Sequence, residues 1–384
     1  MAYPAIGLEN AFSPPITVPG RIARKVRRKL DDWLLGRVAK QYDYLLSTGG
    51  CGYNIGRIVE RERPDIVQLY LIGFNSFRLT SLAGIKVPVV WTFPDQWAFC
   101  GIAHCEPNAE KYVAPAPRAR NWLRPWTDLS EHVRYQKQVT YKTIQQLVAV
   151  CPSRWLTAET KRSALFRDRP IASIPTGCDT EMFAPRDRAA CRVALGLPQE
   201  APIVMVGAGS LELYLKGVDL FIEAINKMST GGRPGGEEAL HIVTFGKDAF
   251  APNLLPSANV RHLGHIVDRR LLSIIYNAAD VFVAPSRIEN LANTVLESLA
   301  CGTPIVAFDI GGMPDAIDHK INGYLAAPYD ASELAEGIRW CLSQRDRNEI
   351  RVACRQKVLT TFSLDREIDS YLSLYDGLLS GRST

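Results

Sequence analysis

No stretch of the sequence is apolar for long enough to cross a membrane. A membrane-spanning helix needs roughly 20 consecutive apolar residues, and the 384-residue chain holds no such run. The opening segment MAYPAIGLENAFSPP also lacks the basic and then apolar order of a secretory signal peptide. We therefore expect a cytoplasmic protein.

Paired cysteine motifs are missing as well. The nine cysteines are an odd number, and none of them forms a Cys-x-x-Cys pair or a Cys/His spacing suited to zinc. We expect reduced, mostly buried thiols and no metal site. The net charge of +5 is too mild to indicate a nucleic-acid partner.

Basic residues are concentrated near the N-terminus, in residues 21–40. Ile22, Val26, Leu30 and Leu34 follow one another at intervals of four among basic side chains, which predicts a basic amphipathic helix. The apolar stripe can pack on the helix's own domain, or the helix can attach to an anionic membrane surface. Both interpretations hold together if only the basic face meets lipid.

Strand-like apolar runs alternate with helical patterns in two series along the rest of the chain. The first series of predicted strands comprises residues 65–74, 88–93, 147–153 and 171–177. The second comprises residues 202–209, 240–246, 259–266, 279–286 and 303–309, with helices beginning near Gly217, Asp268, Thr294 and Ser332. Strands and helices in alternation form a parallel sheet covered on both faces. The sequence therefore predicts an α/β protein with two doubly wound domains.

Polar residues gather after the predicted strand 279–286. Glu289 and Asn290 lie in the loop, and Glu297 follows in the next helix, where Thr294 and Glu297 form the pattern of a capping box. Capping accounts for Glu297 but leaves Glu289 and Asn290 unexplained. Ligands of parallel sheets bind at the carboxyl ends of strands, beside helix N-termini that attract phosphate, so we interpret this loop as part of a binding site.

Two further strand-end loops suit an anion. Gly311 and Gly312 follow the strand 303–309, and adjacent glycines let a bulky anion approach the backbone closely. Lys216 comes at the start of a helix after the strand 202–209, where its charge suits a diphosphate. Three such loops at one sheet edge predict a site for a nucleoside diphosphate.

The segment WTFPDQWAFCGIAH, residues 91–104, crowds aromatic and polar side chains behind a strand of the first series. We expect its Trp91, Trp97 and Phe99 rings to serve as core and cleft wall rather than as platforms for a sugar. Asp95 and His104 are the polar groups left to serve a site.

Several segments together resemble family 4 of the retaining glycosyltransferases, which have the two-Rossmann-domain architecture called GT-B. The run from Asp280 to Phe308 resembles the E-x7-E signature of that family. Further segments resemble the family in the same order, namely IPTGCDTEMFAP, LKGVDLFIEAI, GGMPDAI and NGYLAAPYDASELAEGI. The similarity covers roughly residues 60–345, and the subgroup that it most resembles makes bacterial exopolysaccharides of the colanic-acid type.

The resemblance implies two Rossmann-like domains facing a cleft. Residues 1–185 would form the acceptor side, 186–360 the nucleotide-sugar side, and 361–384 a C-terminal helix that crosses back to the first domain. The implied reaction moves a sugar from a UDP- or GDP-sugar to an acceptor hydroxyl with retained configuration. A polyprenyl-diphosphate-linked saccharide is the expected acceptor, at the inner face of the plasma membrane. The family uses no metal or other cofactor, because helix N-termini and basic side chains neutralise the leaving diphosphate.

The resemblance also implies roles for the candidate residues. Glu289 would contact the donor sugar, Lys216 would hold the diphosphate, and Glu297 would contact the ribose of the nucleotide. Asp95 and His104 join Glu289 as candidate catalytic residues. The other implied donor-binding residues are Asn290, Leu291, Ala292, Asn293 and Thr294 near the phosphates, and Gly311, Gly312 and Met313 along the donor pocket.

The sequence departs from the family in three places. Pro94 replaces a histidine, so that position has neither a side-chain donor nor a base, and Ser210 stands where the family commonly has arginine. The family's first strand and glycine-rich loop have no equivalent in the sequence, which predicts a shortened N-terminal domain. A degenerate relative that binds a nucleotide-sugar or a partner glycosyltransferase without catalysis is therefore the alternative.

Overall fold

The chain divides into two compact units in the computed structural model, which describes residues 18–39, 44–70, 76–116, 128–230, 240–345 and 347–381. Side chains are described for all of these except residues 18–24, 229, 230 and 252. Unit 1 takes the chain up to residue 152, residues 156–173 and the chain from residue 374. Unit 2 takes residues 153–155 and 174–373. The division falls directly after the last strand of unit 1, whereas the sequence placed it at 185/186.

Unit 1 is built on a parallel sheet of four strands in the order β1-β2-β3-β4. The strands are β1 (Val67–Tyr70), β2 (Val89–Thr92), β3 (Leu147–Cys151) and β4 (Ile171–Ser173). All four strands predicted for the first series are confirmed within the described residues, although residues 71–75 lie outside them. Trp91, Trp97 and Phe99 are at most 1% exposed, so these rings belong to the core.

Helices of unit 1 include the basic segment predicted near the N-terminus. They are α1 (Val18–Val38), α2 (Ile55–Glu62), α3 (Glu110–Val113), α4 (Leu129–Lys142) and α5 (Arg154–Arg162), with a 3-10 turn η2 (Leu79–Leu82). The helix predicted for residues 21–40 is thus confirmed as α1, while Lys40 lies outside the described residues. Among the helices that the structure describes, none is long and apolar enough to cross a membrane.

Unit 2 is built on a parallel sheet of six strands in the order β10-β9-β8-β5-β6-β7. The strands are β5 (Ile203–Gly207), β6 (Leu240–Phe245), β7 (Ala258–His262), β8 (Val281–Ala284), β9 (Ile305–Phe308) and β10 (Gly323–Ala326). This order is that of a doubly wound nucleotide-binding sheet, in which the direction of winding reverses between β5 and β8. The sequence predicted five of these strands and missed β10, which is four residues long and has no β-branched side chain.

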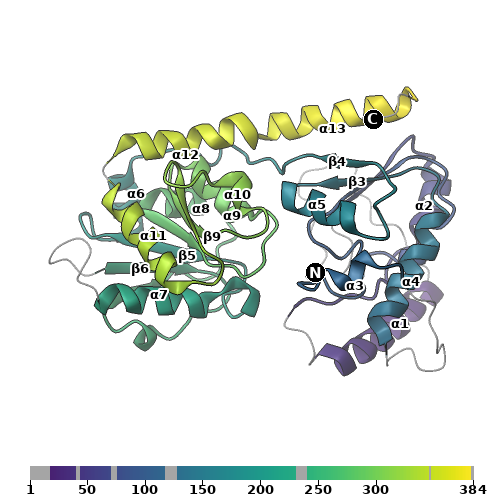
Figure 1. The fold of residues 1–384 in the computed structure, drawn as a ribbon, viewed down its shortest axis with the longest axis horizontal. Coiled ribbons are helices and arrows are strands. Elements are labelled where there is room, and N and C mark those ends of the chain that lie inside the picture. The colour runs from purple at the N-terminus through teal and green to yellow at the C-terminus, as the bar shows by residue number, and fades with distance from the viewer. Residues whose placement is uncertain are drawn as a thin grey trace. The chain divides into compact units, whose positions relative to one another are not determined.

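Helices cover both faces of the unit 2 sheet (Figure 1). The helices of this unit are α6 (Arg188–Leu195), α7 (Val218–Thr230), α8 (Arg269–Ala278), α9 (Asn293–Ala300), α10 (Met313–Ala316), α11 (Ala331–Ser343) and α12 (Asn348–Thr361). They are followed by α13 (Leu364–Leu379), which belongs to this unit only in part. Met205 and Phe282 face the core beneath α8, α9 and α12, whereas Val206 and Val283 face the core beneath α7 and α11. Successive strand residues point to opposite faces, so both faces of these strands must be apolar. The final helix α13 groups with unit 2 up to Ser373 and with unit 1 from Leu374.

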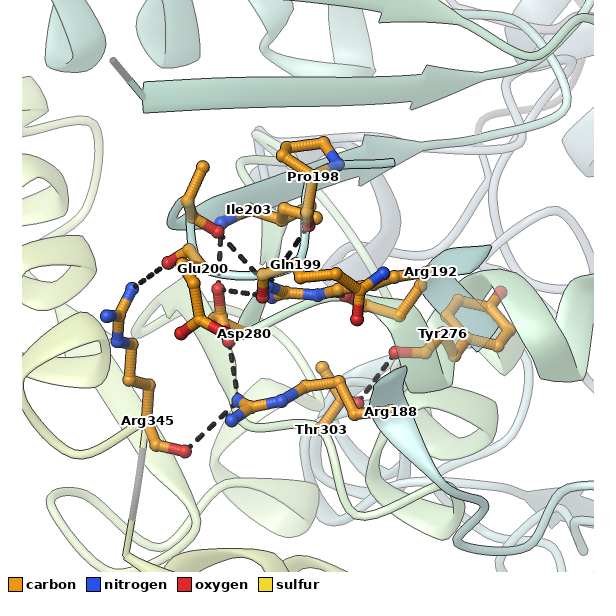
Figure 2. Close-up of polar contacts among 12 residues, drawn as sticks. Arg188, Arg192, Pro198, Gln199, Glu200, Ile203, Tyr276, Asp280, Thr303 and Arg345 are labelled. Atoms are coloured by element: carbon orange, nitrogen blue, oxygen red, sulfur yellow. Dashed lines mark hydrogen bonds and ion pairs between the residues drawn. The ribbon is translucent and has the colours of Figure 1, made fainter. Parts of the chain in front are cut away.

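A buried carboxylate ties α6 to the amino-terminal edge of this sheet (Figure 2). Asp280 pairs with Arg192 at 2.8 Å and with Arg188 at 2.6 Å, and it accepts the backbone N–H of Ile203 at 2.8 Å. The Arg192 guanidinium also donates to the carbonyl oxygens of Pro198, Gln199, Ala201 and Ala278. Each buried charge has partners, as the cost of desolvation requires.

Replacing Asp280 with alanine should lower the free energy of unfolding by about 3–5 kcal/mol, because Arg192 would stay buried without its counter-charge. Urea unfolding followed by circular dichroism measures the loss. Glu223→Ala on α7 is the control, since it removes an exposed carboxylate paired with Lys227 and should cost less than about 1 kcal/mol. Equal losses in the two variants would contradict a structural role for the buried cluster.

Candidate functional site

The predicted site loops of unit 2 lie at the carboxyl edge of its sheet, beside the reversal of strand order. Lys216 follows β5, Glu289 follows β8, and Gly311 follows β9. Strands β5, β8 and β9 are consecutive neighbours in the sheet. Ligands of doubly wound sheets bind outside the carboxyl ends of the strands at this reversal. The sheet topology therefore brings together loops that are far apart in sequence.

Lys216 and Glu289 form an ion pair in this place. Lys216 belongs to the 3-10 turn η4 (Tyr214–Lys216), and its Nζ lies 2.6 Å from Glu289 Oε2. The side chains are 30% and 17% exposed, so both charges can still be reached by solvent. The site thus places a cation and a carboxylate next to each other at the carboxyl edge of the sheet.

Backbone contacts hold the three loops against one another. A Cβ on Gly217 would lie 1.9 Å from the carbonyl oxygen of Pro285, and a Cβ on Gly311 would lie 1.9 Å from that of Glu289. Both glycines have positive φ, of 62° and 53°, which other residues adopt rarely. Gly312 donates its N–H to the Glu289 carbonyl at 3.2 Å. The glycines are therefore required by loop packing, a reason different from the close approach of an anion that the sequence suggested.

The start of α9 is open to a ligand. Ala292 is its N-cap residue, and no described side chain caps the helix. The predicted capping box is wrong, because the helix begins at Asn293 and Glu297 then lies beyond the first turn. Glu297 instead accepts a hydrogen bond from the Tyr276 hydroxyl at 2.9 Å. An uncapped helix N-terminus offers backbone N–H groups and a positive dipole end to an anion.

The remaining predicted donor-binding residues differ in exposure. The Asn290 side chain is buried, and its Oδ1 accepts a hydrogen bond of 2.5 Å from Ser153 Oγ, a residue that groups with unit 2. Leu291 and Met313 are buried in the core, so only their backbones are candidates for ligand contact. Asn293 is exposed and Thr294 half-buried.

Arg287 is a residue of this site that the sequence analysis missed. Its guanidinium makes a bidentate ion pair with Asp219, with distances of 2.7 and 2.5 Å, and donates to the Tyr214 carbonyl at 3.0 Å. This contact lowers the pKa of Asp219 and raises that of Arg287. The backbone N–H of Arg287 donates to Leu215 at 2.8 Å. The sequence feature that could have identified Arg287 is its position, as a basic residue two positions before Glu289.

Ser210 lies in the loop after β5, at the position where the resemblance described above led us to expect an arginine. Its hydroxyl donates to the carboxylate of Asp248. The shorter side chain thus makes a local contact with another loop. Among the described residues, no group of three or more His, Cys, Asp or Glu side chains is arranged to hold a metal ion.

Asp95 and His104 meet within unit 1. Asp95 Oδ2 lies 2.7 Å from His104 Nδ1, and His104 Nε2 lies 2.9 Å from Ser47 Oγ. The chain of contacts is that of a Ser-His-Asp triad, but Ser47 and His104 are only 4% and 2% exposed. A nucleophile must reach its substrate, so this geometry favours a structural network with Asp95 at its more exposed end.

Lys137 of α4 lies beneath the same segment, and the sequence analysis did not single it out. Its buried Nζ donates to the carbonyl oxygens of Trp97, Cys100 and Gly101, and it lies 3.6 Å from the centre of a Trp97 ring. Burial lowers the pKa of Lys137, while three carbonyl acceptors match the three hydrogens of an ammonium group. Lys137 lies four residues after Val133, and thus on the buried face of α4. This spacing is the sequence feature that could have identified it.

Comparison with known proteins finds similarity to glycosyltransferases in unit 2. Residues 202–344 match a family described as "Glycosyl transferases group 1". The D-inositol 3-phosphate glycosyltransferase of Geodermatophilus obscurus is 32% identical over 213 residues, which are 53% of this chain and 46% of that protein. That of Mycobacterium tuberculosis is 32% identical over 214 residues, 53% of this chain and 43% of that protein. The match thus spans about half of each chain.

Solved structures with the same fold cover more of the chain. Sucrose-phosphate synthase from Thermosynechococcus elongatus matches with a TM-score of 0.64 and 19% identity, over 85% of this chain and 77% of that one. Anabaena HepE, solved with UDP and glucose, matches with a TM-score of 0.58 and 15% identity, over 85% and 81%. At these identities the likeness concerns the fold. The chain has two Rossmann-like parallel-sheet domains that match the GT-B architecture, and residues 202–344 carry the group 1 glycosyltransferase similarity.

Proposed function

We propose that the protein is a retaining glycosyltransferase that moves a sugar from a nucleoside-diphosphate sugar to an acceptor hydroxyl. The observation that carries this proposal is the Lys216–Glu289 ion pair beside the uncapped N-terminus of α9. A cation and a helix N-terminus both attract phosphate. A carboxylate in the same place can meet the sugar that the phosphate carries. This combination suits a donor with a charged leaving group and a neutral sugar.

Loss of the leaving group is the step that this arrangement would assist. Cleavage of the bond between the sugar and the diphosphate leaves negative charge on the diphosphate oxygens. Lys216 and the backbone N–H groups of Asn290 to Thr294 would neutralise this charge, which is electrostatic stabilisation of the transition state. Glu289 would then face the sugar and Glu297 the ribose. In this proposal protein charges take the role that a metal ion plays in other enzymes.

The choice of the first donor to test follows from one solved structure with the same fold. The matched curated relatives are named as glycosyltransferases, and HepE has been solved with UDP-glucose. A UDP-sugar is therefore the first donor to test, followed by a GDP-sugar. The acceptor proposed is a saccharide, in the form linked to polyprenyl diphosphate, and the pathway is synthesis of a bacterial exopolysaccharide or cell-surface polysaccharide. This proposal rests on the sequence segments that resemble the subgroup.

Asp95 and His104 are proposed as further residues that serve the reaction, with His104 in contact with the Asp95 carboxylate. Asp95 also accepts the backbone N–H of Trp97 at 2.8 Å, so its carboxylate is held at two points. Pro94 precedes it without a side-chain donor or base. Donor binding without any turnover across a panel of nucleotide-sugars would favour the non-catalytic alternative.

Glu289→Gln should reduce sugar transfer at least about a hundredfold while leaving the fold intact. Glutamine keeps the shape and one oxygen for Lys216 but removes the charge that would meet the sugar. Because the ion pair is partly exposed, the free energy of unfolding should change by less than about 1 kcal/mol. Release of nucleoside diphosphate from a donor and acceptor mixture measures transfer.

Glu223→Gln on α7 is the control, since its carboxylate is exposed and pairs with Lys227 one turn away on the same helix. This variant should transfer sugar at the rate of the wild type. Calorimetry should show that Glu289→Gln still binds the nucleoside diphosphate. Loss of cooperative unfolding in Glu289→Gln, or full transfer by it, would refute the assigned role.

The pH dependence of stability should report on Glu297. Burial raises the pKa of Glu297 above 4.5, and the hydrogen bond from Tyr276 opposes this shift only in part. A carboxyl whose pKa is raised on folding stabilises the folded state below its unfolded pKa, and this contribution is lost as pH rises through the folded pKa. Glu297→Gln removes the dependence and keeps an oxygen for the Tyr276 hydroxyl.

The free energy of unfolding of Glu297→Gln, relative to the wild type, should therefore grow as pH rises from 4.5 toward neutrality. Urea unfolding at a series of pH values measures this difference. Glu223→Gln again controls for the loss of one carboxylate and should run parallel to the wild type. A constant difference for Glu297→Gln would show that its carboxyl is not perturbed by burial.

A further inference from the structure

The turn that carries Lys216 is short and partly exposed. Its internal hydrogen bonds run from the N–H of Lys216 to the Leu213 carbonyl at 2.8 Å and from the N–H of Gly217 to the Tyr214 carbonyl at 3.1 Å. Leu213 and Tyr214 are 43% and 53% exposed, so their packing adds little. A short, exposed turn opens at a low cost in free energy unless other groups hold it. The position of the Lys216 charge therefore depends on contacts from outside the turn.

The guanidinium of Arg287 lies against this turn. It donates to the Tyr214 carbonyl oxygen at 3.0 Å and to the two carboxylate oxygens of Asp219, in the first turn of α7, at 2.7 and 2.5 Å. It also lies 4.1 Å from the centre of the Tyr214 ring, and a Cβ on Gly217 would lie 3.7 Å from its Nη1. The Arg287 side chain is only 14% exposed. One enclosed side chain thus contacts the chain both before and after Lys216.

The backbone of Arg287 is itself held in place. Its N–H donates to the Leu215 carbonyl at 2.8 Å, and its carbonyl accepts the Tyr329 hydroxyl at 3.1 Å. Tyr329 follows β10 and has a φ of 65°, and its ring packs edge-on against Phe308 of β9 with 6.1 Å between ring centres. A residue other than glycine keeps such a φ only where the surrounding contacts enforce it. Arg287 is therefore fixed by the loop after β10 while its side chain holds the turn after β5.

We propose that Arg287 is a positioning residue that holds the Lys216 ammonium where it can meet the diphosphate of a donor, an inference that rests on the proposed function. Asp219 pairs with the guanidinium, so the pair adds little net charge and acts through geometry. Loss of the Arg287 side chain would release the turn and let Lys216 move away from Glu289. A lysine could not replace Arg287, because an ammonium lacks the planar fork that meets a carboxylate and a carbonyl oxygen together.

Amide hydrogen exchange tests this contact without any ligand, so that the inference and the proposed function can fail separately. Arg287→Gln and Arg287→Lys should each speed exchange at Lys216 and Gly217 at least about tenfold. Arg339→Gln is the matched control, since Arg339 donates to the Lys227 carbonyl at 3.2 Å near the other end of α7. This variant should leave exchange in the turn unchanged. Wild-type exchange in Arg287→Gln would overturn the proposal.

Calorimetry with UDP separates positioning from charge. Arg287→Gln and Asp219→Asn change the charge of the site in opposite directions, and the double variant keeps the net charge of the wild type. If Arg287 attracted phosphate by its charge, Asp219→Asn would bind UDP more tightly and the double variant would bind it like the wild type. For a positioning residue, Arg287→Gln and the double variant should both bind UDP at least about tenfold more weakly. Wild-type affinity in the double variant would overturn the proposal.

A double-mutant cycle with Lys216 shows whether Arg287 acts through it. Lys216→Gln should weaken UDP binding about tenfold, and the addition of Arg287→Gln should weaken it no further, because the ammonium that Arg287 positions is already lost. Arg339→Gln should bind UDP like the wild type. Additive losses from the Lys216 and Arg287 variants would overturn the proposal.

GDP takes the place of UDP in these titrations if the wild type binds only GDP. No binding of either nucleotide by the wild type would refute the proposed function, and with it a role of Arg287 in donor binding. Wild-type binding of one of them, with unchanged affinity in Arg287→Gln, would refute the role of Arg287 alone.

Discussion

Backbone contact between strand-end loops is the constraint on which the candidate site depends. At Gly217 and Gly311 a carbonyl oxygen of a neighbouring loop occupies the space where any other residue would place its Cβ. The loop after β8 is therefore in contact with those after β5 and β9, and Glu289 is in reach of Lys216. Any side chain at these glycines would separate the loops and with them the two charges. The geometry of the site thus depends on the absence of a Cβ atom at Gly217 and at Gly311.

Charges in this protein serve two purposes, and burial separates them. Asp280 and Arg192 are buried with every charge matched, and they fasten α6 to the amino-terminal edge of the unit 2 sheet. Lys137 is likewise enclosed by carbonyl oxygens within unit 1. Lys216 and Glu289, in contrast, form a single partly exposed pair at the carboxyl edge. The buried charges thus stabilise the fold, whereas the partly exposed pair of Lys216 and Glu289 is accessible to a ligand.

Much of the secondary structure could be predicted because a strand covered on both faces is apolar throughout. Every predicted strand appears among the described residues, with helices starting close to the expected positions, as at Val218 and Arg269. We did not predict β10 from the sequence, because it has only four residues and none of them is β-branched. The capping box between Thr294 and Glu297 was wrong because the helix begins at Asn293, two residues earlier than that box requires, and the glutamate then lies beyond the first turn.

The sequence by itself determined the two α/β units, the strand-end loops and the residue types available to bind a diphosphate. Only the tertiary structure decided which side chains are enclosed and which can meet a ligand. His104 and Lys137 are polar residues that packing encloses, whereas Trp33 is an apolar residue that packing leaves exposed. Periodicity along a chain shows that a helix has an apolar stripe, but not which side of it faces the core. That side is chosen by the elements packed against the helix, because burial is a property of neighbours that are distant in sequence.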